Sequence, residues 1–149
     1  MFENANAVHD YALAGRGVLT LTSEKTGVRY TFKITQALDK ATSAPQERWF
    51  VSLLTGPENT ADYTYLGMLD ERGFRTTKAS KLTPDSLPVR GFAFFWKHIA
   101  AGTMPPQMEV RHEGSCGRCG RALTVPESLD TGLGPECAAK AGVAWKTNA

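Results

Sequence analysis

A strict alternation of apolar and polar residues at positions 28–35 constrains the fold more than any other feature of the sequence. The apolar set is Val28, Tyr30, Phe32 and Ile34, and the polar set between its members is Arg29, Thr31, Lys33 and Thr35. A period of two places each set on its own face of a β-strand. A second run of strand-forming residues, 18–22, precedes it, and the turn residues 24–27 separate the two. The sequence therefore predicts an antiparallel hairpin with a basic outer face.

Three further runs, 48–54, 63–69 and 74–78, are rich in strand formers and are separated by turn-rich segments. Residues 108–111 are a candidate for one more short strand. An apolar stripe at helical spacing, formed by Val89, Phe92, Trp96 and Ile99, predicts a helix that begins at Pro88. We expect an α+β fold over residues 16–107, with an antiparallel sheet of about five strands and one covering helix. Phe92, Phe95 and Trp96 are expected in the core, and residues 1–15 are expected to form a loose arm with at most one helical turn.

All three cysteines lie in the last third of the chain, with the spacing Cys-x2-Cys-x17-Cys at Cys116, Cys119 and Cys137. The first residues lack the basic and apolar regions of an export signal, and no apolar run is long enough to span a bilayer. We therefore expect a cytoplasmic protein without membrane association. In that compartment an odd, clustered set of cysteines favours a metal site over disulfides.

The cysteine spacing is typical of a zinc knuckle, in which a glycine-containing turn directs two sulfurs toward one point. Pro135 is suited to the first turn of a short helix over residues 135–141, which would carry Cys137. This arrangement predicts a treble-clef-like module over residues 108–149 that holds one structural Zn²⁺. Zinc prefers four ligands, and His112 is the best candidate for the fourth. The alternatives are Glu113, Glu127, Asp130, Glu136 and water, of which water would give the site a catalytic form.

The segment from Cys116 to Cys137 contains the elements Cys-Gly-x-Cys-Gly-Arg, Pro-x-Ser and Gly-x-Gly-Pro-x-Cys. It resembles a zinc-knuckle module of small bacterial and bacteriophage proteins of unassigned function. Residues 49–57 and 63–67 also resemble the domain that accompanies this module in phage and prophage proteins. The resemblance implies bound zinc and a phage or prophage setting inside a bacterial host cell, and it implies no particular reaction.

Charge is unevenly distributed, although the formal net charge of the chain is only +2. Residues 72–107 contain six basic residues and one acidic residue. The candidate nucleic-acid-binding residues are Arg72, Arg75, Lys78 and Lys81, at spacings of three, together with Arg118 and Arg121 beside the knuckle. Arg29 and Lys33 add to a strand face, and Tyr30, Tyr63 and Tyr65 could stack on bases. DNA or RNA binding is the leading hypothesis, and a solvated basic surface is the simpler alternative.

Two other classes of function remain open. A protein that binds and inhibits a host factor, such as a defence complex, would expose an apolar patch, for which Trp145 is a candidate anchor. An enzyme is less favoured, because the sequence shows no Ser/His/Asp set, no motif of paired carboxylates and no phosphate-binding loop.

Overall fold

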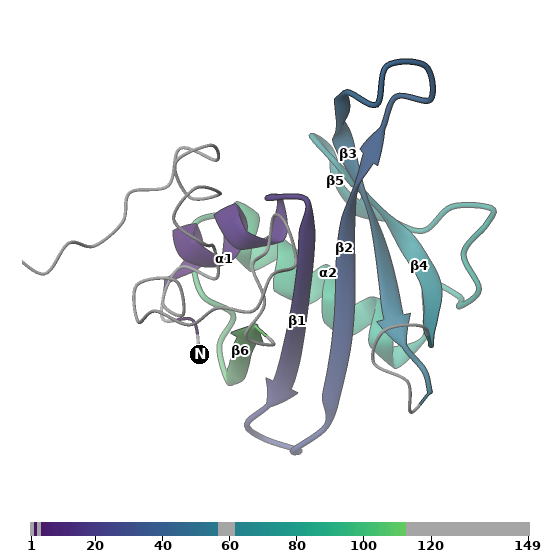
Figure 1. Ribbon diagram of the computed structural model, residues 1–149. Helices are drawn as coiled ribbons and strands as arrows, with labels where there is room; N and C mark the ends of the chain where they lie inside the picture. Colours follow the sequence, from purple (N-terminus) through teal and green to yellow (C-terminus); the bar gives the residue numbers. More distant parts are fainter. Residues whose placement is uncertain (1, 3, 57–61, 113–149) are drawn as a thin grey trace, which may run out of the picture.

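The computed structural model describes residues 2, 4–56 and 62–112, which form one antiparallel sheet and two helices (Figure 1). The elements in chain order are α1 (Ala5–Ala12), β1 (Arg16–Ser23), β2 (Arg29–Leu38), β3 (Pro45–Leu54), β4 (Tyr63–Asp70), β5 (Gly73–Arg75), α2 (Leu87–Ala100) and β6 (Met108–His112). The sheet has the strand order β5-β4-β3-β2-β1-β6. The α+β class is confirmed, and the sheet has six strands where about five were expected.

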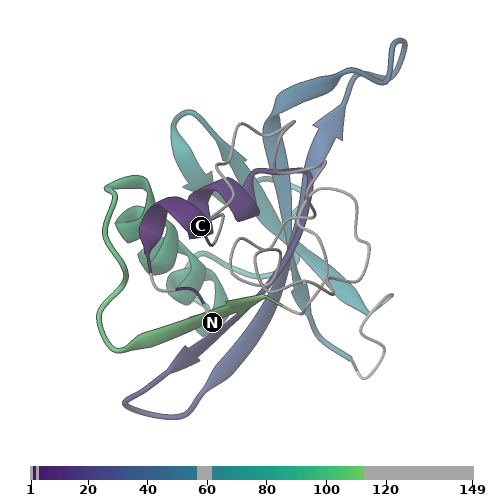
Figure 2. The same ribbon diagram turned by 60° about the vertical axis from the view of Figure 1, so that its left-hand side comes forward.

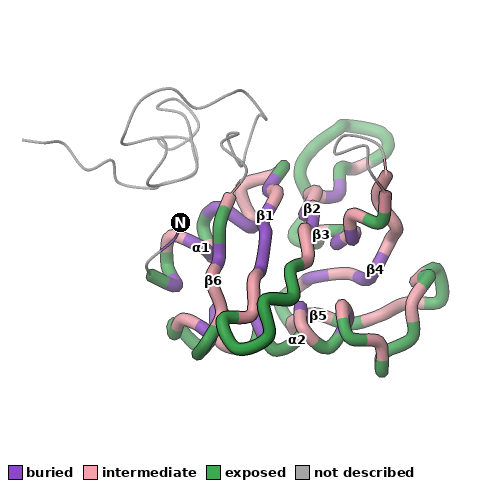
Figure 3. The backbone as a smooth tube through the Cα atoms, turned by 90° about the horizontal axis from the view of Figure 1, so that it is seen from below, coloured by how far each residue is buried: buried purple, intermediate pink, exposed green. Residues whose placement is uncertain are grey.

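The expected hairpin is confirmed as β1 and β2. Leu19 pairs with Phe32 and Leu21 with Tyr30, so the apolar positions of both strands share one face of the sheet. Gly27, in the connecting turn, has a φ of +74°, a conformation that glycine adopts without steric cost. Along the strands, buried positions recur among partly exposed ones, as the burial-coloured tube shows (Figure 3).

Both helices cover the same face of the sheet (Figure 2). Phe92 of α2 lies at the centre of the core, where its ring centroid is 5.0 Å from that of Phe32 and 4.7 Å from that of Phe74. Phe92 and Phe95 are fully buried and Trp96 nearly so, which confirms the expected core role of these three residues. Neither helix described by the structure is long and apolar enough to cross a membrane.

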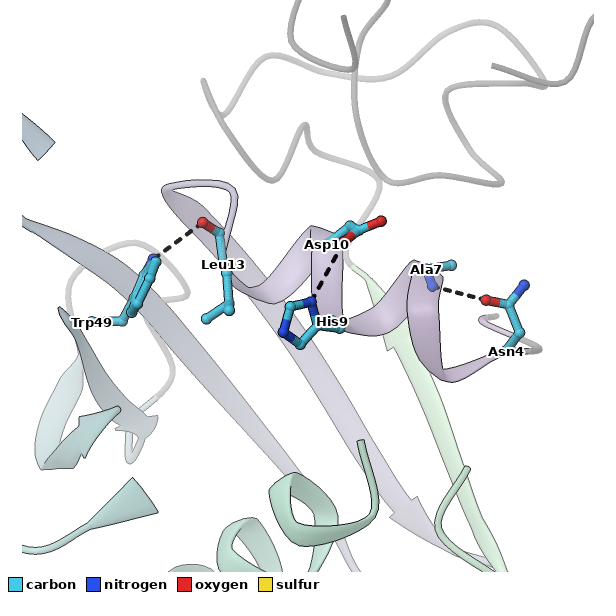
Figure 4. Close-up of polar contacts among 6 residues, drawn as sticks. All are labelled: Asn4, Ala7, His9, Asp10, Leu13 and Trp49. Atoms are coloured by element: carbon cyan, nitrogen blue, oxygen red, sulfur yellow. Dashed lines mark hydrogen bonds and ion pairs between the residues drawn. The ribbon is translucent and has the colours of Figure 1, made fainter. Parts of the chain in front are cut away.

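The N-terminal segment is not the loose arm that its composition suggests. α1 begins after Asn4, whose side-chain oxygen accepts a hydrogen bond of 2.8 Å from the backbone N–H of Ala7 (Figure 4). Val8, Tyr11 and Ala12 of this helix are fully buried. Just beyond α1, the indole N–H of Trp49 donates to the carbonyl oxygen of Leu13 at 3.1 Å. Packing against the rest of the domain stabilises this short helix, and a local sequence window does not contain that information.

The sixth strand also extends the sheet past the expected boundary at residue 107. β6 pairs antiparallel with β1, from Ser23↔Met108 to Leu19↔His112. The backbone N–H of Phe2 donates to the carbonyl oxygen of Val110 at 2.9 Å, which ties the start of the chain to this strand. Residues 108–112 therefore belong to the sheet, and the expected zinc module, apart from these residues, lies outside the described residues.

Candidate nucleic-acid interface

The side chains that point away from α1 and α2 form the second surface of the sheet, here called the open face. Its members follow from the strand register, because residues paired across strands share a face and neighbours along a strand alternate. The charged members are the basic residues Arg16, Arg29, Lys33, Arg48, Arg75 and Arg111 and the acidic residues Asp70 and Glu109. Six basic and two acidic residues give the open face a formal charge of +4, which exceeds the net charge of the whole chain.

Three aromatic side chains, Phe50, Tyr63 and Tyr65, form an aromatic group on the open face over β3 and β4. The rings of Phe50 and Tyr65 meet edge to face, with centroids 6.1 Å apart. Ser52 pairs with Lys33 on one side and Tyr65 on the other. The Lys33 ammonium lies 4.4 Å from the centroid of the Tyr63 ring, at cation–π distance. Aromatic rings and a basic group therefore stand side by side on the same surface.

A hollow of about 760 Å³ occupies the other end of the open face, over β1, β2 and β6. Arg29 and Arg111 line it together with threonine hydroxyls, and Thr20 and Thr31 are hydrogen-bonded to each other at 2.9 Å. Glu109 pairs with Arg111 at 3.6 Å, and both side chains are substantially exposed. An exposed pair of this kind is weak, so Arg111 remains available to an anionic ligand.

The structure does not bring the four predicted basic residues of the middle stretch into one stripe. Arg75 lies on β5 and forms an ion pair of 2.7 Å with Asp70. Arg72 lies in the turn between β4 and β5, and Lys78 and Lys81 lie in the loop after β5. Part of this loop lies beside β4, since the backbone N–H of Lys81 donates to the carbonyl oxygen of Tyr65 at 3.2 Å. Arg72, Lys78 and Lys81 are exposed along the β5 edge of the sheet.

The tyrosines expected to stack on bases are divided between the two faces. Tyr63 and Tyr65 lie on the open face, whereas Tyr30 pairs with Leu21 on the helix-covered face and packs near Phe32. Sequence reasoning missed Phe50, because residues 48–54 are apolar at both parities and do not reveal which residue points outward. It also missed Arg111, whose position on the open face follows only from the pairing of β6 with β1.

His112 is the only expected zinc ligand within the described residues. Its ring lies at the end of β6, with centroids 5.4 Å from Phe2 and 5.7 Å from Tyr11. Within the described part of the chain, no group of three or more His, Cys, Asp or Glu side chains could hold a metal ion. The other predicted site residues lie outside the described part of the chain: Cys116, Cys119 and Cys137, the basic residues Arg118 and Arg121, and the alternative ligands Glu113, Glu127, Asp130 and Glu136.

A family model described as "Family of unknown function (DUF6011)" matches residues 106–142, which include β6 and all three cysteines. Neither the search of curated proteins nor the search of solved structures finds a match. A segment of 37 of the 149 residues is thus similar to a family to which no function is assigned.

Proposed function

We propose that this protein is a small zinc-binding protein that associates with nucleic acid through the open face of its sheet. The main support is that the open face, which neither α1 nor α2 covers, contains six basic side chains and only two acidic ones. Phosphates attract such a surface, and the release of their counterions drives binding. Arg72, Lys78 and Lys81 extend the positive charge along the β5 edge, beyond the strands themselves.

Salt-dependent binding of labelled oligonucleotides tests this proposal. The variant R29Q/K33Q removes two charges from the open face, and we expect the slope of log affinity against log salt to become shallower by about 1.4 for a single strand. The matched control R90Q/K97Q removes two exposed charges from α2, on the opposite side of the sheet. If the parent binds neither DNA nor RNA at about 50 mM salt, or if both double variants weaken binding equally, the proposal is wrong.

Zinc, in this proposal, has a structural role and is held by Cys116, Cys119, Cys137 and His112. Contacts of the His112 ring with Phe2 and Tyr11 fix the imidazole at the end of β6, directly before the cysteine-containing segment. The chemistry of the set suits zinc, which takes thiolate and imidazole ligands in closed structural sites. Arg118 and Arg121 would add positive charge beside the thiolates. The phage or prophage setting and the bacterial cytoplasm rest on the resemblance alone.

A second function, binding of a host protein, is favoured by an exposed apolar patch formed by Val28, Leu87 and Phe94. These residues are 47%, 67% and 41% exposed, and they line a hollow of about 670 Å³ between the β1–β2 turn and α2. Exposed apolar patches are common at protein interfaces. If F94S still binds a protein partner and R29Q/K33Q does not, the partner binds the open face. If R29Q/K33Q still binds it and F94S does not, the partner binds the apolar patch.

A further inference from the structure

The aromatic group on the open face indicates a ligand that offers more than phosphate charge. Phe50 is 37% exposed, although it lies on a strand in the interior of the sheet. Tyr65 adds a second ring at 6.1 Å, and Tyr63 a third on the same strand as Tyr65. Electrostatic attraction to phosphate does not require any of these rings, so positive charge alone does not explain the composition of this surface.

We infer that the open face binds single-stranded nucleic acid, with unpaired bases stacked on Phe50 and Tyr65 and phosphates held by Lys33, Arg29 and Arg111. This inference rests on the proposed function and specifies its ligand. In a duplex the faces of the bases are covered by their neighbours, so rings standing on a sheet surface have access only to unpaired bases. Stacking is tolerant of sequence, because every base has a flat π surface.

The arrangement of charge beside the rings supports the same ligand. The Lys33 ammonium lies 4.4 Å from the centroid of the Tyr63 ring. A group that binds phosphate therefore stands next to a ring on which a base can stack, and a nucleotide carries both a phosphate and a base. Leu54 links the two halves of the face, because it pairs with Tyr63 and also lines the hollow that contains Arg29 and Arg111. From β4 to β6 the face spans four strand spacings, or about 19 Å, which is wide enough for several nucleotides.

The test compares a labelled 12-nucleotide oligo(dT), the oligo(U) of the same length and the oligo(dT)·oligo(dA) duplex, with the full chain as purified. We expect both single strands to bind more tightly than the duplex at about 150 mM salt. F50A should weaken single-strand binding by about fivefold or more, without changing the salt slope, because no charge is lost. F50W should retain binding, and its added indole fluorescence should be quenched when a base stacks on it. F94A, at an exposed ring on α2, is the matched control.

The results that contradict the inference alone differ from the result that also contradicts the proposed function. Equal affinity for duplex and single strand, or unchanged binding by F50A, would overturn the inference and leave the proposed function standing. Absence of binding to all three probes at about 50 mM salt would overturn both. A preference for oligo(U) over oligo(dT) would identify RNA as the ligand, and the opposite preference DNA; either agrees with stacking. Thermal melting of each variant shows whether a loss of binding reflects a loss of fold.

Discussion

The hydroxyl of Tyr11 makes two hydrogen bonds to the backbone of β1, as a neighbouring strand would. It donates to the carbonyl oxygen of Val18 and accepts from the N–H of the same residue, each at 3.0 Å. The last described pairing of β1 with β6 is at Leu19, one residue beyond Val18. A side chain of α1 thus satisfies the backbone of β1 at the point where the described pairing stops, and it joins the helix to the sheet.

Tyr11→Phe removes this hydroxyl and leaves both Val18 groups without their partner. We expect the free energy of unfolding to fall by about 2 kcal/mol, since unsatisfied buried polar groups are costly. Urea denaturation measures the change. Tyr30→Phe is the control, because this half-buried tyrosine lies on the same face of the sheet, and it should cost less than about 0.5 kcal/mol. Equal losses for the two variants would show that the Val18 contacts contribute nothing specific.

Asp39 lies in the loop between β2 and β3, where its carboxylate accepts three hydrogen bonds. The backbone N–H groups of Thr42 and Ala41 and the hydroxyl of Thr42 donate to its carboxylate, and they lower its pKa below the ordinary value of 3.8. A lowered pKa in the folded state means that the carboxylate stabilises this loop above about pH 4, and that the contribution disappears as the pH falls through the folded-state pKa. An NMR titration of the Asp39 side-chain carbonyl should give a pKa below 3.8, and a value above 3.8 would contradict the loop geometry.

Two phenylalanines of α2 lie in opposite surroundings. Phe92 is fully buried against Phe32, Phe74 and Phe95, whereas Phe94 is 41% exposed two positions further along. Phe92→Ala should lower the free energy of unfolding by about 3–5 kcal/mol, because it leaves a cavity at the centre of the core. Phe94→Ala should cost less than about 1 kcal/mol by the same urea measurement. Similar costs at the two positions would mean that α2 does not dock with this face.

The same elements show which parts of the fold could be predicted from the sequence. The β1–β2 hairpin and α2 were predictable, because alternation at positions 28–35 and the stripe from Val89 to Ile99 are local patterns. α1 was not, because its alanines and polar residues form a helix whose stability comes from contacts with distant strands. The open face was only half predictable: Lys33 could be assigned to an outward position, but Phe50 and Arg111 required the register of β3 and the pairing of β6.

The described core contains no residue beyond Val110. If zinc folds the segment that follows, Cys137→Ala should release the metal and leave α2 and the strands from β1 to β5 protected from hydrogen exchange, because the metal supplies the folding energy of the module alone. Elemental analysis of the parent should find about one equivalent of zinc per chain. Less than about a tenth of an equivalent would refute the metal site, and global loss of protection in the variant would show a shared core.

During synthesis, β6 is the last of the described strands to become available to the sheet. Successive strands from β1 to β5 are hydrogen-bonded neighbours, so each can join the growing sheet soon after it leaves the ribosome. β6 joins from the opposite end of the order, after the whole of α2 has been made, and closing so long a loop is slow. Until then one side of β1 is an open edge onto which another nascent chain could add a strand. Chains truncated before Met108 should therefore be the aggregation-prone species, and a pause in translation within α2 would prolong their lifetime.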